Sequence, residues 1–336
     1  MNYSSRFFLY APFALLLAVA AVVGAHWWVL EGALARRLDA MNARPAMPGV
    51  TIRFASRAIG GFPFRLDAVF RDFQVEVATG HGPAIWRAEH FALHALTYGR
   101  DETIFEAAGR QRLAWVDMAG RPHGLEFETG SLHASAIENA GGLSRFDLDL
   151  VGFGSAALTA SRIQFHIRRD PAGDLLDVTA SADDVDLSPS LRGAFGDAIK
   201  SVHLEGTIAS ATALDGLRAG RTDWRSALEA WRKASGTLHA EPFEIDWGRL
   251  DMSARGTVAL DDLHRPQGLL DFKILGMADW LARNPPLRPS GVAAALRDRA
   301  AKAGSDAAGR MGAVLGARDG IVYLGDEPVA TVAPLY

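Results

Sequence analysis

The sequence contains no cysteine, which excludes thiol catalysis, disulfide bonds and thiolate metal sites. A chain without cysteine is compatible with an oxidising envelope compartment but does not require one. Lysine is nearly absent too, so almost all of the 35 basic residues are arginine. The formal net charge of −4 provides no long-range attraction for nucleic acid or for anionic lipid headgroups.

Recognisable catalytic and metal-binding motifs are also missing. His90 and His94 are four residues apart, but no glutamate follows the first histidine as in a zincin helix, and on a strand they would lie about 13 Å apart. Asp183, Asp184 and Asp186 resemble a calcium cluster without the glycine and late glutamate of an EF-hand loop. We interpret the aspartates as a solvated turn.

The serine and tryptophan residues do not indicate a catalytic or binding site either. The segment 152–156 has glycine before Ser155, but Ala156 replaces the second glycine of a nucleophile elbow. Trp224, Trp231 and Trp247 have a spacing typical of core packing rather than of a carbohydrate platform. The sequence therefore assigns no catalytic residue, no cofactor-binding residue and no metal ligand.

The N-terminus contains the clearest feature, an apolar run from Phe7 to Leu30 in which His26 is the one ionisable residue. As a helix the run would rise about 36 Å, enough to cross a hydrocarbon core of about 30 Å. Trp27 and Trp28 stand where an interfacial aromatic belt is expected. The alternative is a cleaved signal peptide with Val23-Gly24-Ala25 as its cleavage site. We favour the anchor, because apolar residues continue at helical spacing beyond that site.

Charge alone does not orient this anchor. Arg6 and the α-amine flank one end, and Arg36 and Arg37 flank the other, offset by nearby acidic residues. We place the N-terminus inside because an N-terminal anchor before one large domain usually translocates that domain.

After a Pro/Gly connector at 44–49 the hydrophobic period changes from helical to two, which is typical of half-buried strands. Around Arg71-Asp72 the alternation slips by one residue, which indicates a bulge or tight bend. One apolar and one polar face per strand predicts an antiparallel sheet wetted on one side. The alternation recurs at 146–150, 163–167, 176–180, 202–208, 243–247, 250–254 and 270–274.

Three helices are expected to interrupt the sheet. Ser188 followed by Pro189 reads as a helix start, with apolar residues continuing to Ile199 at four-residue spacing. Thr222 or Asp223 is expected to cap a second helix that contains Trp224, Leu228 and Trp231 and a Glu229–Lys233 pair. The Ala/Gly-rich segment 290–315 is expected to form a weakly docked third helix, followed by a strand pair at 321–332.

The fold class predicted from these patterns is mainly β with a few helices: a transmembrane helix, then a long, curved, mostly antiparallel sheet with helices packed on it. The expected organisation is a short tail at 1–6, a transmembrane helix at 7–30, a juxtamembrane helix and connector at 31–49, and one β-rich domain at 50–336. No low-complexity linker divides the last part.

Several short segments occur in an order that resembles a family of bacterial envelope proteins, domain-of-unknown-function family 2125. The resemblance implies a Gram-negative inner-membrane protein with its body in the periplasm, and it supplies no catalytic residues. The segments are Gly60-Gly61-Phe62-Pro63-Phe64-Arg65, Trp86 to Leu96 with Thr97-Tyr98, Gly236-Thr237-Leu238, Asp246-Trp247-Gly248, Ala254-Arg255-Gly256-Thr257, Arg265-Pro266-Gln267-Gly268, 319–325 and Pro334-Leu335-Tyr336.

Three functional hypotheses follow. The first is a non-enzymatic envelope protein whose amphipathic sheet binds lipid or another apolar ligand in a groove; the apolar face is otherwise a packed core against the helices. The second is an envelope-assembly scaffold that recruits proteins through a sheet edge. The third is a periplasmic hydrolase, which requires a converged pair of polar catalytic groups that sequence spacing does not show. Expected partners are the membrane, through the N-terminal helix, and a lipid or envelope protein, with no nucleic acid and no cofactor.

Overall fold

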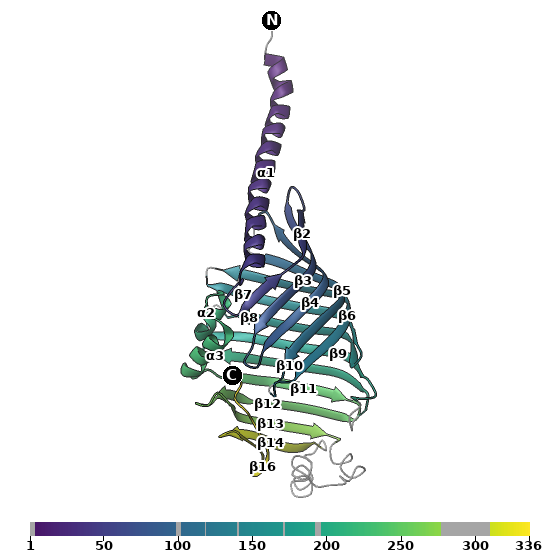
Figure 1. Ribbon diagram of the computed structural model, residues 1–336, viewed down its shortest axis with the longest axis vertical. Helices are drawn as coiled ribbons and strands as arrows, with labels where there is room; N and C mark the ends of the chain where they lie inside the picture. The colour runs from purple at the N-terminus through teal and green to yellow at the C-terminus, as the bar shows by residue number, and fades with distance from the viewer. Residues whose placement is uncertain are drawn as a thin grey trace.

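The computed structural model describes residues 4–98, 102–117, 119–139, 141–170, 172–191, 196–276 and 310–336. It shows a long N-terminal helix that leads to a large curved sheet, with two short helices at one side of the sheet (Figure 1). The fold class predicted from the sequence is therefore confirmed.

Helix α1 runs without interruption from Ser4 to Ala43. Its apolar half stands clear of the sheet, with exposed side chains such as Leu17, whereas Leu34 and Leu38 pack into the buried cluster at the start of the sheet. In the part of the chain that the structure describes, α1 is the one helix long and apolar enough to cross a membrane. A salt bridge of 2.7 Å from Arg57 to Asp39 holds its last turns against the sheet.

The strands form a single antiparallel meander in which β2 pairs with β3 outside the main order, and all the other strands follow one another from β1, β3 and β4 to β16. Their bounds are β1 Val50–Arg53, β2 Ser56–Gly60, β3 Arg65–Ala78, β4 Pro83–Leu96, β5 Glu102–Val116, β6 Pro122–Asn139, β7 Gly142–Ser155, β8 Leu158–Arg169, β9 Leu175–Leu187, β10 Ala198–Ala209, β11 Leu238–Trp247, β12 Leu250–Leu260, β13 Pro266–Leu275, β14 Met311–Arg318, β15 Ile321–Leu324 and β16 Glu327–Thr331.

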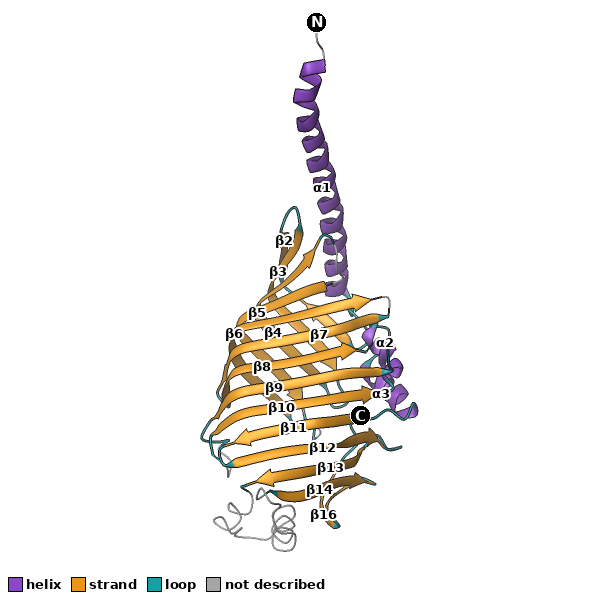
Figure 2. Cartoon of the chain, turned by 180° about the vertical axis from the view of Figure 1, so that it is seen from behind, coloured by secondary structure: helices purple, strands orange, loops and turns teal. Residues whose placement is uncertain are grey.

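The sheet curls so that its first strands cross over one face of its middle strands. Strands β3 and β4 run obliquely in front of β8–β10 in Figure 1, and the opposite view in Figure 2 shows them behind β7–β10. The space between these two parts of the sheet is the inside of the molecule.

A line of interruptions in the strand pairing, here called the bulge line, crosses the sheet and contributes to this curvature. In the β3–β4 ladder the pairing skips Asp72 together with Glu89, and the ladders from β6–β7 to β9–β10 are interrupted on the same line without a change of register. The register itself shifts by one residue on this line in the β4–β5, β5–β6 and β10–β11 ladders. Asp72, Gly109, Gly152 and Asp184 have left-handed backbone conformations on this line, with φ between 47° and 76°. Each bulge bends its strand and increases the local twist, so an aligned series bends the sheet as a whole. The slip predicted at Arg71-Asp72 is one member of this series.

Helices α2 (Asp215–Arg218) and α3 (Trp224–Lys233), with the 3₁₀ helix η1 (Ala211–Leu214), lie beside the sheet between β10 and β11. Asp223 caps α3 by accepting a hydrogen bond of 3.0 Å from the backbone N–H of Ser226, as the sequence predicts. Trp231 is buried against Leu176 of β9, so α3 covers one end of the sheet interior.

Two of the predicted helices are wrong where the structure describes them. Ile199 lies in β10, paired with Val185 and Trp247, and residues 188–191 form a turn. Met311 to Leu315 lie in β14, whereas residues 277–309 fall outside the described part. Ile199 is in a strand because its pairing on both sides overrides the weak helix propensity of a glycine-rich segment. The four-residue spacing of apolar residues there does not reflect a helix.

Candidate functional site

Three apolar rows run across the inner face of the sheet, at right angles to the strands. Because paired residues stand directly opposite each other, the register aligns one side chain from each strand. The first row extends from β2 to β14: Ile59, Ala68, Leu93, Phe105, Ala134, Leu148, Phe165, Ala180, Leu204, Phe243, Ala254, Phe272 and Ala313.

The second row lies beside the first and extends from β3 to β14. With neighbouring strands about 4.8 Å apart, it is about 50 Å long along the sheet. Its members are Phe70, Phe91, Ala107, Leu132, Leu150, Ile163, Ala182, Val202, Ile245, Met252, Ile274 and Met311.

The third row lies on the other side of the first and contains one polar residue, Thr103. Its remaining members are Leu66, Ala95, Ala136, Phe146, Ile167, Val178, Gly206, Ala240, Gly256, Leu270, Leu315 and Leu324.

The end of these rows nearest to α1 is a filled core. Phe70 is 1% exposed and touches Phe54, Phe73 and Phe91 at ring-centroid distances of 5.0, 5.4 and 5.8 Å. Leu38 of α1 belongs to the same cluster. This part of the interior has no room for a ligand, so here the packed-core interpretation applies.

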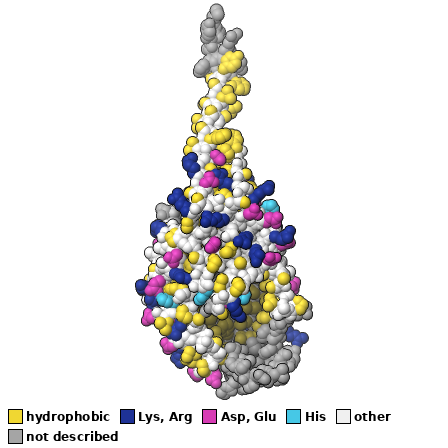
Figure 3. Space-filling model, in the orientation of Figure 1, with side chains coloured by type: hydrophobic (Ala, Val, Ile, Leu, Met, Phe, Trp, Pro, Cys, Tyr) yellow, Lys and Arg dark blue, Asp and Glu magenta, His cyan; other side chains and the backbone are white. Residues whose placement is uncertain are grey.

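The middle stretch of the rows, on β7–β11, is different. None of its ten side chains in the first two rows is fully buried, and none belongs to a buried hydrophobic cluster of the described residues. Figure 3 shows a hollow with hydrophobic side chains in front of the later strands. The middle stretch is therefore an apolar surface of the interior with fewer packing partners than a core provides.

The far end of the rows is buried again. Ile274 and Met311 are 6% and 1% exposed and form a cluster with Leu250. The three rows therefore have a filled end at α1, a half-buried middle and a second buried cluster at β12–β14.

The outer face of the same strands is polar and contains His90 and His94, the histidines considered above as metal ligands. His94 lies between Asp67, at 2.7 Å, and Glu106, at 3.6 Å. His133 contacts the other oxygen of Glu106 at 3.4 Å. His90 is exposed on the same strand as His94, and the described residues contain no group of three or more potential metal ligands.

A second polar cluster on this face centres on Asp147. Its carboxylate contacts His166 at 2.7 Å and accepts hydrogen bonds from Arg145, at 2.6 Å, and Ser135, at 3.3 Å. Burial by itself raises the pKa of Asp147, but the hydrogen bonds from His166 and Arg145 outweigh it and hold the pKa below its usual value. The serine contacts the carboxylate rather than the imidazole, whereas a nucleophilic triad places the histidine between them.

The remaining sequence candidates have local structural partners. Ser155 accepts hydrogen bonds from the backbone N–H groups of Ala157 and Leu158 and donates to the carbonyl of Leu158, so it shapes the β7–β8 turn. Asp183 and Asp184 lie in β9 at its bulge, not in a turn, because the strand continues to Leu187. The turn predicted there is wrong.

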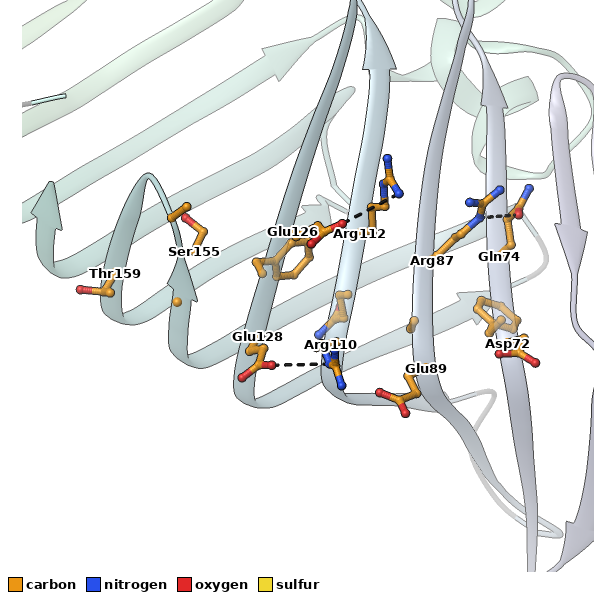
Figure 4. A pocket seen from close by; sticks show the side chains of 16 residues that line it. Asp72, Gln74, Arg87, Glu89, Arg110, Arg112, Glu126, Glu128, Ser155 and Thr159 are labelled. Atoms are coloured by element: carbon orange, nitrogen blue, oxygen red, sulfur yellow. Dashed lines mark hydrogen bonds and ion pairs between the residues drawn. The ribbon is translucent and has the colours of Figure 1, made fainter. Parts of the chain in front are cut away.

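A surface depression of about 770 Å³ lies where the bulge line crosses β3–β8. Its charged side chains form exposed pairs across the strands, with Arg112 and Arg110 each 3.9 Å from Glu126 and Glu128 respectively (Figure 4). Exposed pairs at this distance contribute little to binding or stability. The three apolar rows, which the strand register aligns, are a more distinctive candidate site than this depression.

Sequence analysis identified the apolar faces of β1, β3 and β7–β13 but missed the three rows. The signal that would reveal them is the pairing register, which relates residues on different strands. Each row member can be read as apolar in the sequence, but its neighbours in the row are known only once the strands are paired.

A comparison with known protein families matches most of the chain. A family model described as "Uncharacterized protein conserved in bacteria (DUF2125)" matches residues 27–333. No curated protein matches the chain. The matched segment starts in the last turn of the apolar part of α1 and includes every described strand, so this chain belongs to the DUF2125 family of bacterial proteins.

Proposed function

We propose that this protein is an inner-membrane-anchored envelope protein that holds the acyl chains of a lipid, or another apolar ligand, along the middle stretch of its apolar rows. On this proposal α1 anchors the chain, the sheet lies in the periplasm, and the protein has no catalytic role. The observation that supports it is the half-burial of ten residues on β7–β11, five consecutive members of each of the first two rows. Apolar surface of that extent gains free energy when an apolar ligand removes it from water.

The shape of the surface favours chain-like ligands. The rows are long and narrow, and acyl chains make the same non-directional contacts with Leu, Ile, Val and Phe that core side chains make. The middle stretch offers no polar side chain in its first two rows, so it provides no hydrogen bond with which to select a polar ligand. Selectivity for a headgroup would have to come from the rims.

Lipid content of the purified full chain tests the proposal. Phe165→Glu places a charge on the first row, and Gln164→Glu places the same charge on the outer face of the same strand. We expect Phe165→Glu to lose most of the co-purifying lipid measured by mass spectrometry of the solvent extract, whereas Gln164→Glu retains it. Lipid around α1 is common to both variants and does not affect the difference.

A second variant tests the same surface in case Phe165→Glu prevents folding. Ala182 is in the second row between Ile163 and Val202, so Ala182→Phe would fill the surface without adding charge. We expect this variant to keep its strand content by circular dichroism and to bind less lipid. Equal lipid content in the parent chain, Phe165→Glu and Ala182→Phe would overturn the proposal.

The two alternatives have less support. The described edge strand β16 is five residues long and contains Pro328, which removes one backbone donor and weakens pairing with another chain. For a hydrolase, the Ser135–Asp147–His166 contacts are in an order that does not activate the serine. Both remain hypotheses.

A further inference from the structure

An exposed aromatic cluster lies beside α1 at the level where the helix leaves its apolar part. The tip of the β2–β3 hairpin presents Phe62 and Phe64, which are 59% and 56% exposed. Tyr98 and Leu96, at the end of β4, are 62% and 48% exposed. Figure 1 shows the hairpin projecting from the sheet along α1, toward the N-terminal end of the molecule.

Direct contacts attach this cluster to α1. The Trp27 indole donates a hydrogen bond of 2.7 Å to the carbonyl of Arg65, and its ring meets that of Phe62 edge-on with centroids 5.5 Å apart. The backbone N–H of Thr97 donates to the carbonyl of Phe64 at 3.0 Å. The hairpin tip, the end of β4 and α1 therefore form one assembly.

The position of this assembly along α1 places it at a membrane boundary. From Phe7 to Trp28 the helix rises about 32 Å, close to the hydrocarbon thickness of about 30 Å. Phe62 reaches beyond Trp27 to Gly24, where an added Cβ would lie 4.0 Å from its ring. Gly24 lies about 4.5 Å deeper along the helix than Trp27. A bilayer that covers the apolar part of α1 would also cover Phe62.

We infer that the β2–β3 hairpin tip and the end of β4 form a second membrane contact, in which Phe62, Phe64, Leu96 and Tyr98 enter the lipid interface next to α1. Aromatic side chains are favoured in that interface. A single helix does not define how the sheet is tilted and rotated relative to the bilayer. Two contacts, one through α1 and one through the hairpin tip and the end of β4, define both. Because β2 also contains Ile59, the first member of the first row, the contact places the start of the apolar rows beside the lipid.

The absence of cysteine allows this contact to be measured by single-cysteine spin labelling of the full chain. The label is placed at Phe62→Cys in liposomes of phosphatidylcholine and phosphatidylglycerol, and its collision rates with oxygen and with a water-soluble nickel complex are compared. Val22→Cys on α1 is the lipid reference. Leu263→Cys, in the β12–β13 turn, is the water reference, because Leu263 is 58% exposed and apolar like Phe62.

We expect the oxygen-to-nickel ratio at residue 62 to shift from the value at 263 toward the value at 22. A ratio at 62 equal to that at 263 would overturn the inference. A second measurement places the label at Tyr98→Cys. Replacing Phe62 and Phe64 by serine in that chain should shift the oxygen-to-nickel ratio at 98 toward the value at 263. An unchanged ratio at 98 in a chain with unaltered circular dichroism would also count against the contact. Neither measurement depends on lipid in the apolar rows.

Discussion

Single residues contribute very unequally to the interior of this protein. Phe70 is enclosed by three other phenylalanine rings, whereas Phe165, in the middle of the neighbouring row, is half-buried. The same side chain type therefore stabilises the fold at one end of the rows and supplies an open apolar surface in the middle. Burial, not residue type, separates the two roles.

Removing the Phe70 ring should strongly destabilise the fold. Phe70→Ala loses its transfer free energy and leaves a cavity among rings that cannot fully collapse, which typically costs about 3–5 kcal/mol. Val69→Ala is the matched control, since Val69 is next to it on β3 and 50% exposed, and surface changes usually remain within about 0.5 kcal/mol. Urea unfolding of the full chain in detergent measures both; equal losses would contradict a filled core at this end.

The outer-face carboxylates predict how stability depends on pH. For Asp67 and Asp147, burial raises the pKa, but hydrogen bonds, chiefly from His94 and His166 respectively, outweigh it, so the folded-state pKa lies below the ordinary value. A lowered pKa adds stability that is complete above the unfolded-state pKa of about 3.9 and is lost as the pH falls through the folded-state pKa.

Thermal unfolding measured from pH 7 down to pH 2 tests this dependence. We expect the melting temperature to fall below about pH 4, and the fall to be smaller in the double variant Asp67→Asn, Asp147→Asn, which has lost these groups. If the double variant shows the same acid slope as the parent chain, other carboxylates are responsible.

Among the structural elements, the bulge line contributes to the curvature of the sheet. Asp72 has φ 52°, a left-handed conformation that costs a non-glycine residue about 1–2 kcal/mol. The cost is tolerated because the slip keeps apolar side chains on the inner face on both sides of it: Phe70 before the bulge and Phe73 and Val75 after it. Bending and side-chain direction are thus set by the same residue.

Substitutions at Asp72 should follow backbone preference rather than side-chain chemistry. We expect Asp72→Gly to retain or raise stability, and Asp72→Val to lower it by about 1–2 kcal/mol, because valine is disfavoured at positive φ. Gln74→Val, in ordinary strand conformation two residues later, controls for the change in surface polarity. Chemical denaturation measures all three variants, and equal stability of Asp72→Val and Asp72→Gly would argue against the bulge.

At the level of the whole molecule, the proposed function requires one helix and one continuous sheet to take up a defined position relative to the bilayer. The expected arrangement puts the sheet in the periplasm, and the chain offers a direct measurement because any introduced cysteine is unique. Asp326→Cys, in the exposed β15–β16 turn, should react with a membrane-impermeant maleimide in intact spheroplasts. Arg6→Cys, on the opposite side of the anchor, should react only after lysis. The reverse pattern would invert the topology.

Features that depend on residues close together in the chain could be predicted before the structure. The apolar run from Phe7 to Leu30 predicts the long apolar helix α1, period-two alternation predicts strands and their apolar faces, and Thr222 or Asp223 predicts the start of α3. Local patterns suffice for these because helical turns, strand pleats and caps form between near neighbours.

The structure was needed to show how those faces combine. It joined Leu148, Phe165 and Leu204 into one row, placed Met311 and Ile199 in strands rather than helices, and left the middle of the rows half-buried while filling both ends. The physical reason is that strand register and packing are contacts between segments far apart in the chain. An apolar side chain specifies that it will avoid water, but not which partner will cover it.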